Sequence, residues 1–227
     1  MNEAERRQRL ISWLEVIYAD VEDLLLDDHI FWSLQELIAG NPRFKQSPGL
    51  FTQWMASSFI QATAVGVRRH AKGDDDSVSL KRFLREVKKF PGLVSRAHYL
   101  SFFADAEDWL RQSGAQGFDR MAGKGAASIP TTLVDEHLAK LDAAVSGIEH
   151  YVDRRVAHYD KRGLAKPTPT LGELTAALRV LEELVMFYWL YLKGSSMSTM
   201  LPTIQFDWEA IFRFQWMAET AGAGELH

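Results

Sequence analysis

An apolar stripe over residues 131–162 constrains the fold of this chain more than any other feature of its sequence. Its members recur at spacings of three and four residues, and at about 100° per residue they lie on one side of a helix. Gly163 and the prolines after it end the pattern. The spacing therefore predicts one long amphipathic helix from Thr131 to Arg162. The stripe consists of Val134, Leu138, Leu141, Val145, Ile148, Val152, Val156 and Tyr159.

Two polar residues near the end of this helix are candidates for catalysis. On a helical wheel centred on Val152, His158 lies about 120° and Arg154 about 160° from the middle of the apolar face, one turn apart. A histidine can transfer protons at neutral pH, and a guanidinium can stabilise a pentavalent phosphate. The alternative interpretation of His158 is a structural role, in which its ring forms a hydrogen bond with a neighbouring helix or with Asp160. We expect Arg154 and His158 on the exposed or interfacial side, with these residues buried: Val134, Leu141, Ile148 and Val152.

Further basic residues could hold RNA beside this pair. Arg68 and Arg69 lie at the end of an earlier helix and could contact the same phosphate. The alternative interpretation is that they stabilise the C-terminus of that helix and pair with Asp74 to Asp76. The further RNA-binding candidates on the long helix itself are Arg155, Lys161 and Arg162.

The composition is that of a globular chain with a substantial core. Of its 227 residues, 47% are hydrophobic and 11% aromatic, and none is cysteine, which excludes disulfides and thiolate metal sites. The charged start, MNEAERRQRL, does not fit a secretory signal. The longest wholly apolar run, Leu184 to Leu192, is far shorter than the roughly 20 residues of a membrane helix. We therefore expect a cytoplasmic protein that needs no metal and no cofactor and does not enter a membrane.

The net charge of −4 argues against nucleic-acid binding by the whole surface. A local basic patch, such as the one at the end of the long helix, could still bind RNA.

The rest of the chain predicts helices and no strands. Residues 113–128 are rich in Gly, Ala and Ser and are expected to form a hinge-like loop with at most one helical turn. The aromatic residues between Met186 and Leu192 are expected to belong to the core or to a dimer face. The sequence thus predicts an all-α, antiparallel helical bundle, with residues 1–227 as a single domain. Besides 131–162, the expected helices are 3–26, 28–39, 47–70, 80–89, 95–112, 171–193 and 208–219.

Two stretches resemble the HEPN superfamily (higher eukaryotes and prokaryotes nucleotide-binding) of its abortive-infection type. RRVAHYDKR is similar to the family's motif region, which reads Arg-Asn-Lys-x-x-Ala-His-x-Asp; Ala157, His158 and Asp160 match it, and Asp153 stands where the family has Asn. VRRHAKGDDDSVSL is similar to the region upstream of the motif. The resemblance covers roughly residues 50–215. It implies a HEPN-like bundle and a metal-independent ribonuclease of a prokaryotic defence or toxin–antitoxin system.

The chain departs from this family at one position of the motif. Active members have an Arg, then four to six intervening residues, then the His, and the positions for that Arg here hold Tyr151, Val152 and Asp153. Either Arg154 supplies the guanidinium from a neighbouring position, or the motif is degenerate. The resemblance also implies a homodimer with facing motif helices and a possible antitoxin protein as partner. The other interpretations are a non-catalytic RNA- or protein-binding module and a purely structural helical scaffold.

Overall fold

The computed structural model of the protein describes residues 2–40, 49–74, 76–153 and 168–213. Within these ranges the chain is helical and contains no strand, only an isolated β-bridge between Ser95 and Ser128. The predicted all-α class is therefore confirmed. The helices are α1 (Glu3–Gly40), α3 (Leu50–Ala71), α4 (Leu80–Lys89), the 3-10 helix η1 (Pro91–Leu93), α5 (Arg96–Ser101), α6 (Asp108–Ala122), α7 (Thr131–Tyr151), α8 (Leu171–Lys193) and α9 (Ala210–Arg213).

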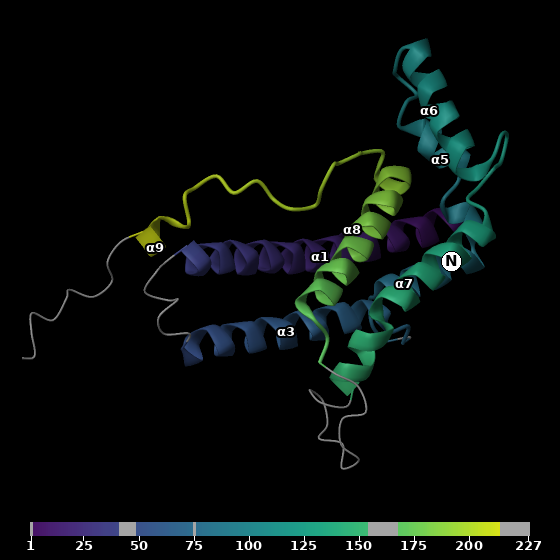
Figure 1. The fold of residues 1–227 in the computed structure, drawn as a ribbon. Helices are drawn as coiled ribbons and strands as arrows, with labels where there is room; N and C mark the ends of the chain where they lie inside the picture. The colour runs from purple at the N-terminus through teal and green to yellow at the C-terminus, as the bar shows by residue number, and fades with distance from the viewer. Residues whose placement is uncertain (1, 41–48, 75, 154–167, 214–227) are drawn as a thin grey trace, which may run out of the picture.

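Two antiparallel helix pairs form the body of the bundle (Figure 1). α1 and α3 run side by side in opposite directions, and α7 and α8 do the same, with α8 crossing α1. α4 packs on α7, while α5 and α6 project as a lobe beyond the other helices. None of the described helices is long and apolar enough to cross a membrane.

The apolar stripe of α7 faces this core, as the sequence predicts. Val134, Leu141, Ile148 and Val152 are all at least 97% buried, and Val145 lies with them. Removing each such side chain from water stabilises the fold by roughly 1.5–3 kcal/mol. The burial of Val152 fixes the rotation of α7 about its axis up to the end of the described part of that helix. Residues 152 and 153 continue α7 as a π-helical turn, and residues 154–162 of the predicted helix lie outside the described ranges.

The predicted helix break between residues 26 and 28 is wrong, because α1 continues to Gly40. Asp28 is 5% exposed, and it accepts a hydrogen bond from the Thr175 hydroxyl at 2.9 Å. Trp32 in turn donates its indole N–H to Thr175 at 3.3 Å. In an isolated peptide the Asp28 carboxylate could cap the start of a new helix. Here it is hydrogen-bonded to Thr175 of α8, and α1 continues past Asp28 without a break.

The expected loop over residues 113–128 is also wrong in its first ten residues, which belong to α6. Conversely, the expected helix 95–112 is interrupted after α5 by turns. A Cβ at position 114 would lie only 2.9 Å from the Phe103 ring, so the glycine lets that ring pack closely against α6. Phe118 of the same helix is fully buried. Packing of two aromatic rings thus decides the structure of a stretch whose composition favours a loop. Of the expected helix 208–219, residues 208 and 209 form a turn, α9 spans Ala210–Arg213, and residues from 214 on lie outside the described ranges.

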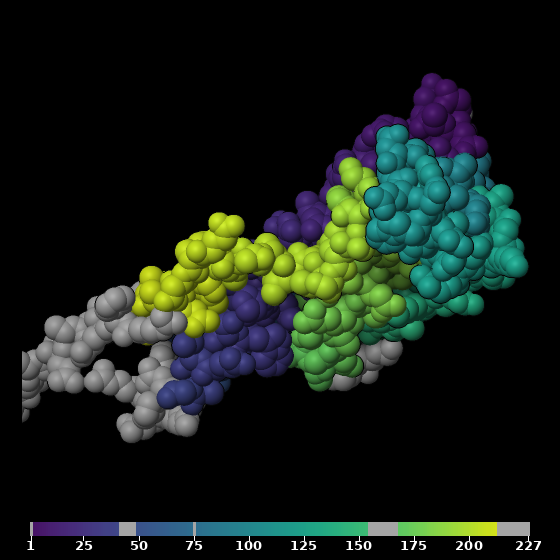
Figure 2. Space-filling view, turned by 90° about the horizontal axis from the view of Figure 1, so that it is seen from above, coloured from purple at the N-terminus to yellow at the C-terminus, as the bar shows by residue number. Residues whose placement is uncertain are grey.

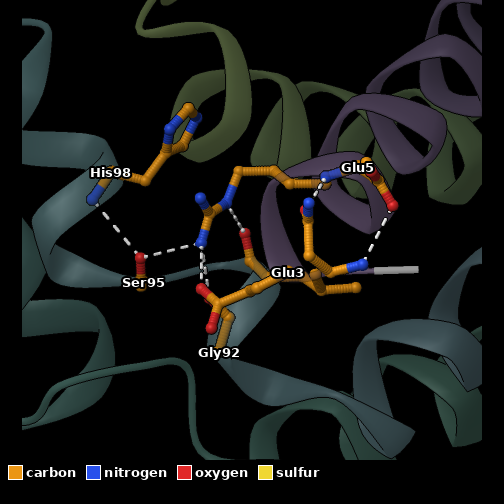
Figure 3. A network of polar contacts seen from close by, with 8 residues as sticks. Glu3, Glu5, Gly92, Ser95 and His98 are labelled. Atoms are coloured by element: carbon orange, nitrogen blue, oxygen red, sulfur yellow. Dashed lines mark hydrogen bonds and ion pairs between the residues drawn. The ribbon is translucent and has the colours of Figure 1, made fainter.

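A polar network ties the lobe of α5 and α6 to the start of α1 (Figure 3). Arg7 donates from Nε to the Leu93 carbonyl at 2.9 Å and from Nη2 to the Gly92 carbonyl at 3.0 Å. Ser95 caps α5 by accepting from the backbone N–H of His98, and the His98 ring bonds the Leu192 carbonyl at the end of α8. The lobe is therefore held at its base by both α1 and α8.

Candidate functional site

The two residues predicted to be catalytic, His158 and Arg154, lie outside the described residues. The same holds for four predicted supporting residues, which are Arg155, Asp160, Lys161 and Arg162. The structure does describe Arg68, Arg69 and Asp153, and it shows what surrounds the last described residue of the motif helix.

Arg68 of α3 binds Asp153 at the end of α7. The Nε of Arg68 donates a hydrogen bond to Oδ1 of Asp153 at 2.5 Å, and Nη2 of the same guanidinium also contacts Oδ1. Both side chains keep partial access to solvent, 30% for Arg68 and 41% for Asp153. The contact brings an arginine to the motif helix from a helix that ends more than 80 residues earlier.

Two more charges complete this contact, and we call Arg68, Lys72, Glu149 and Asp153 the α3–α7 charge cluster. The Nζ of Lys72 lies 2.8 Å from Glu149 Oε1 and 3.6 Å from Asp153 Oδ2. The hydrogen bond with Glu149 raises the pKa of Lys72, against the opposing effects of burial and Arg68. Glu149 and Asp153 are one turn apart at the C-terminal end of α7, where the helix dipole disfavours acids. The two cations offset that unfavourable placement.

Arg69 contacts a different helix from Arg68. Its Nη2 lies 3.2 Å from Oδ1 of Asp20 on α1. The neighbouring His70 is buried, and its Nε2 lies 2.9 Å from Oδ2 of the same carboxylate. Burial acts to raise the pKa of Asp20, but the contacts with His70 and Arg69 outweigh it and lower that pKa. The structure therefore does not bring Arg69 to the motif helix.

The alternative interpretation of Arg68 and Arg69 is wrong about their partners. The described contacts pair them with Asp153 and Asp20 and not with Asp74 or Asp76, and Asp75 lies outside the described residues. Sequence reasoning missed Lys72 and Glu149 as members of the cluster. The i, i+4 spacing of Glu149 and Asp153 was a visible signal for an acidic face, but nothing local pointed to α3 as its partner.

Chemically, the cluster offers a guanidinium and an ammonium that are already hydrogen-bonded to carboxylates at the end of the motif helix. In the described part of the chain, no group of three or more His, Cys, Asp or Glu residues lies close enough together to hold a metal ion. The arrangement suits recognition of an anion such as a phosphate, which would share or replace the carboxylate contacts.

Comparison with known proteins gives one match. A family model described as AbiU2, of the HEPN type, matches residues 7–211, from the first turns of α1 into α9. No curated protein matches the chain, and no solved structure matches it.

Proposed function

The chain belongs to AbiU2, a HEPN-type abortive-infection family, and from that premise we propose that it is a metal-independent ribonuclease of a prokaryotic defence or toxin–antitoxin system. In this proposal His158 transfers protons, and arginine guanidinium groups hold the scissile phosphate. Arg154 and Arg68 are the arginines that we assign to this role. Arg155, Lys161 and Arg162 add backbone contacts to the RNA.

The observation that carries the proposal is the contact between Arg68 and Asp153. The family pattern asks for an Arg, then four to six intervening residues, then the His, and Asp153 occupies one of the positions open to that Arg. Asp153 has no guanidinium of its own, but its carboxylate binds that of Arg68. In this proposal Arg68 of α3 takes the role of the arginine that the motif lacks in sequence.

The geometry of Arg68 leaves it able to contact a phosphate. Its described contacts with Asp153 use Nε and Nη2, and within the described residues Nη1 has no hydrogen-bond partner. A guanidinium presents five N–H donors in a planar fork, so a phosphate oxygen can bind Nη1 while Asp153 keeps its place. Asp153 acts here as a positioning residue that fixes the fork.

The proposed reaction needs only these groups. His158 removes the proton from a ribose 2′-hydroxyl, the 2′-oxygen attacks the adjacent phosphorus, and the bond from phosphorus to the 5′-oxygen breaks. The leaving 5′-oxygen takes up a proton from an imidazolium, which leaves a 2′,3′-cyclic phosphate and a 5′-hydroxyl. The guanidinium groups stabilise the charge on the pentavalent phosphate.

A second candidate function, a binding module without catalysis, is favoured by the charge balance of the cluster. Glu149 and Asp153 offset the charges of Lys72 and Arg68, so RNA has to compete with two carboxylates for these cations. In that case the protein binds RNA or a partner such as an antitoxin chiefly through Arg154, Lys161 and Arg162. Affinity would then fall steeply as the salt concentration rises.

We also propose a homodimer in which the motif helices of two subunits face each other. This proposal rests on the family. The late aromatic residues divide: Tyr188 and Tyr191 are buried in the core, whereas Phe187 and Trp189 are partly exposed and Phe206 is exposed. Light scattering over micromolar concentrations should give a mass near twice the 25.8 kDa of one chain. A constant monomer mass would remove the shared groove from the proposal.

The ribonuclease proposal is tested with purified protein and a structured RNA in the presence of EDTA. We expect cleavage that chelation leaves intact, products with 2′,3′-cyclic phosphate ends, and no cleavage by His158→Ala. If the wild type cleaves no faster than His158→Ala but binds the RNA in a salt-sensitive way, the binding module replaces the nuclease. If it neither cleaves nor binds RNA, both proposals fall.

A further inference from the structure

A cavity of about 560 Å³ lies between the α5–α6 lobe and the C-terminal half of α8. In the space-filling view the lobe is seated against that end of α8 (Figure 2). The volume lies within the range of about 300–1,000 Å³ that is typical of small-molecule sites. The cavity reaches α7 at Leu133, near the start of that helix, whereas the α3–α7 charge cluster lies at its other end. At 1.5 Å per residue the two regions are roughly 30 Å apart along α7, so the cavity is a separate feature.

Two tyrosine hydroxyl groups without a described partner line this cavity. Tyr99 of α5 and Tyr191 of α8 are only 6% and 7% exposed, and their rings are 5.0 Å apart. Within the described residues, neither hydroxyl makes a hydrogen bond. The oxygen atoms themselves reach solvent, since the two ring nitrogens of His70 are the only buried side-chain N or O atoms without a hydrogen bond among the described residues. Both groups are therefore available to a molecule that occupies the cavity.

A positive charge stands beside these hydroxyls. Arg120 of α6 lines the cavity, and no described residue forms an ion pair with it. The adjacent acid, Asp119, is already engaged by Arg96 at 2.5 Å and by the backbone N–H of Gly125. Burial raises the pKa of both Tyr99 and Tyr191, and the charge of Arg120 acts in the opposite direction on each. The charge of Arg120 therefore interacts with both hydroxyl groups, and no described residue forms an ion pair with Arg120.

Gly117 keeps the space between these groups open. A Cβ at this position would lie 3.8 Å from the Tyr99 hydroxyl and 3.9 Å from Nη2 of Arg120. Both polar atoms therefore converge on the volume that the missing side chain leaves. These distances are ordinary van der Waals contacts, so a small side chain at 117 would enter the cavity without straining the helix.

The remaining walls are flat and apolar. Phe103 and Phe187 present aromatic rings, and Leu110 and Leu190 present aliphatic surface; all four are partly exposed. Such walls favour a planar ring, while the polar corner favours a negative group.

We propose that this cavity binds a small aromatic anion, with its ring between Phe103 and Phe187 and its acidic group on Arg120 and the hydroxyls of Tyr99 and Tyr191. The acid can be a phosphate or a carboxylate, since both accept hydrogen bonds from a guanidinium and from tyrosine. The site does not depend on the proposed ribonuclease activity. Leu133 is its one described lining residue on α7, and it lies at the opposite end of that helix from the motif.

The test uses 8-anilinonaphthalene-1-sulfonate, a fluorescent aromatic anion, with the full chain. We expect saturable binding to the wild type. Arg120→Gln should weaken it about tenfold or more by removing the charge, and Gly117→Leu should do the same by filling the cavity. Arg111→Gln is the matched control, because Arg111 is an exposed arginine of the same helix that pairs with Asp108 and does not line the cavity.

Competition then identifies the natural acid. Adenosine 5′-monophosphate should displace the dye where adenosine does not if the site takes a phosphate, and indole-3-acetate should do so where indole does not if it takes a carboxylate. Circular dichroism checks that each variant is folded, and Arg120→Gln, an exposed change, carries the test if Gly117→Leu does not fold. The proposal is overturned if the dye does not bind, if it binds wild type and Arg120→Gln equally, or if neither acid displaces it.

Discussion

The Nε of Arg68, on α3, lies 2.5 Å from Oδ1 of Asp153, at the end of α7. The two residues join the C-terminal ends of two helices that are neighbours in space and far apart in sequence. The pair has two consequences: it adds modestly to stability, and it brings a guanidinium from α3 to the end of the motif helix.

The contribution of this pair to stability can be measured by a double-mutant cycle. Because both side chains are about one-third exposed, we expect a coupling free energy of about 0.5–1 kcal/mol between Arg68→Ala and Asp153→Ala in urea unfolding. Arg69→Ala is the control, since Arg69 contacts Asp20, and its coupling with Asp153→Ala should be near zero. Equal coupling for the two arginines would show that the Arg68 contact is not specific.

Glu182 should anchor the segment that follows α8. This carboxylate is 5% exposed, and it accepts hydrogen bonds from the Thr199 hydroxyl at 2.6 Å and from the Met200 backbone N–H at 2.9 Å. Burial acts to raise the pKa of Glu182, but these bonds and Arg179 outweigh it and lower that pKa. The stability that it contributes is therefore present above the pKa of an unfolded Glu and is lost as the pH falls below it.

We expect Glu182→Ala to lower the free energy of unfolding by roughly 2–3 kcal/mol, because charged, buried hydrogen bonds are lost. It should also speed proteolysis after α8. The neighbouring Glu183→Ala removes only an exposed pair with Lys140 and should cost less than about 1 kcal/mol. Similar proteolysis rates for both variants would contradict the anchoring role.

His137 should make the fold sensitive to mild acid. Its Nδ1 lies 2.9 Å from the hydroxyl of the fully buried Tyr188, and burial, aided by Lys140, lowers the pKa of His137. The unfolded chain therefore takes up a proton at higher pH than the folded chain does. Stability from the neutral ring is present above about pH 6.5, the usual histidine pKa, and is lost as the pH falls toward the folded value.

The measurement is the thermal midpoint at pH 7.5 and at pH 5.5. We expect the drop between these values to be smaller in His137→Gln, which has no ring to protonate, than in the wild type. An equal drop in both proteins would assign the acid sensitivity to other groups.

Periodicity predicted the buried face of α7 correctly because a stripe of aliphatic side chains has one low-energy orientation toward a core. It failed where a tertiary contact overrides a local signal. Asp28 resembles a helix cap in sequence, yet Thr175 on α8 satisfies its carboxylate. Residues 113–122 have the composition of a loop, yet Phe103 and Phe118 hold them as a helix.

For the candidate site, sequence reasoning found the relevant helix ends but not their pairing. It named Arg68, Arg69 and Asp153 separately, since the charge of each is visible in the sequence. Which arginine meets Asp153 depends on the rotation of α3 against α1 and α7, and one residue of rotation, about 100°, separates a partner on α7 from a partner on α1. No local pattern carries that information.

The central claim, that Arg68 supplies the arginine missing from the motif helix, is tested most directly by the RNA cleavage rate of Arg68→Ala beside Arg69→Ala. We predict a loss of about 10²–10³ in rate for Arg68→Ala, as is typical when one preorganised transition-state contact is removed, and little change for Arg69→Ala. The exchange Arg68→Asp with Asp153→Arg keeps the ion pair and should recover most of the lost rate. A wild-type rate in Arg68→Ala, or equal losses in both single variants, would contradict the account.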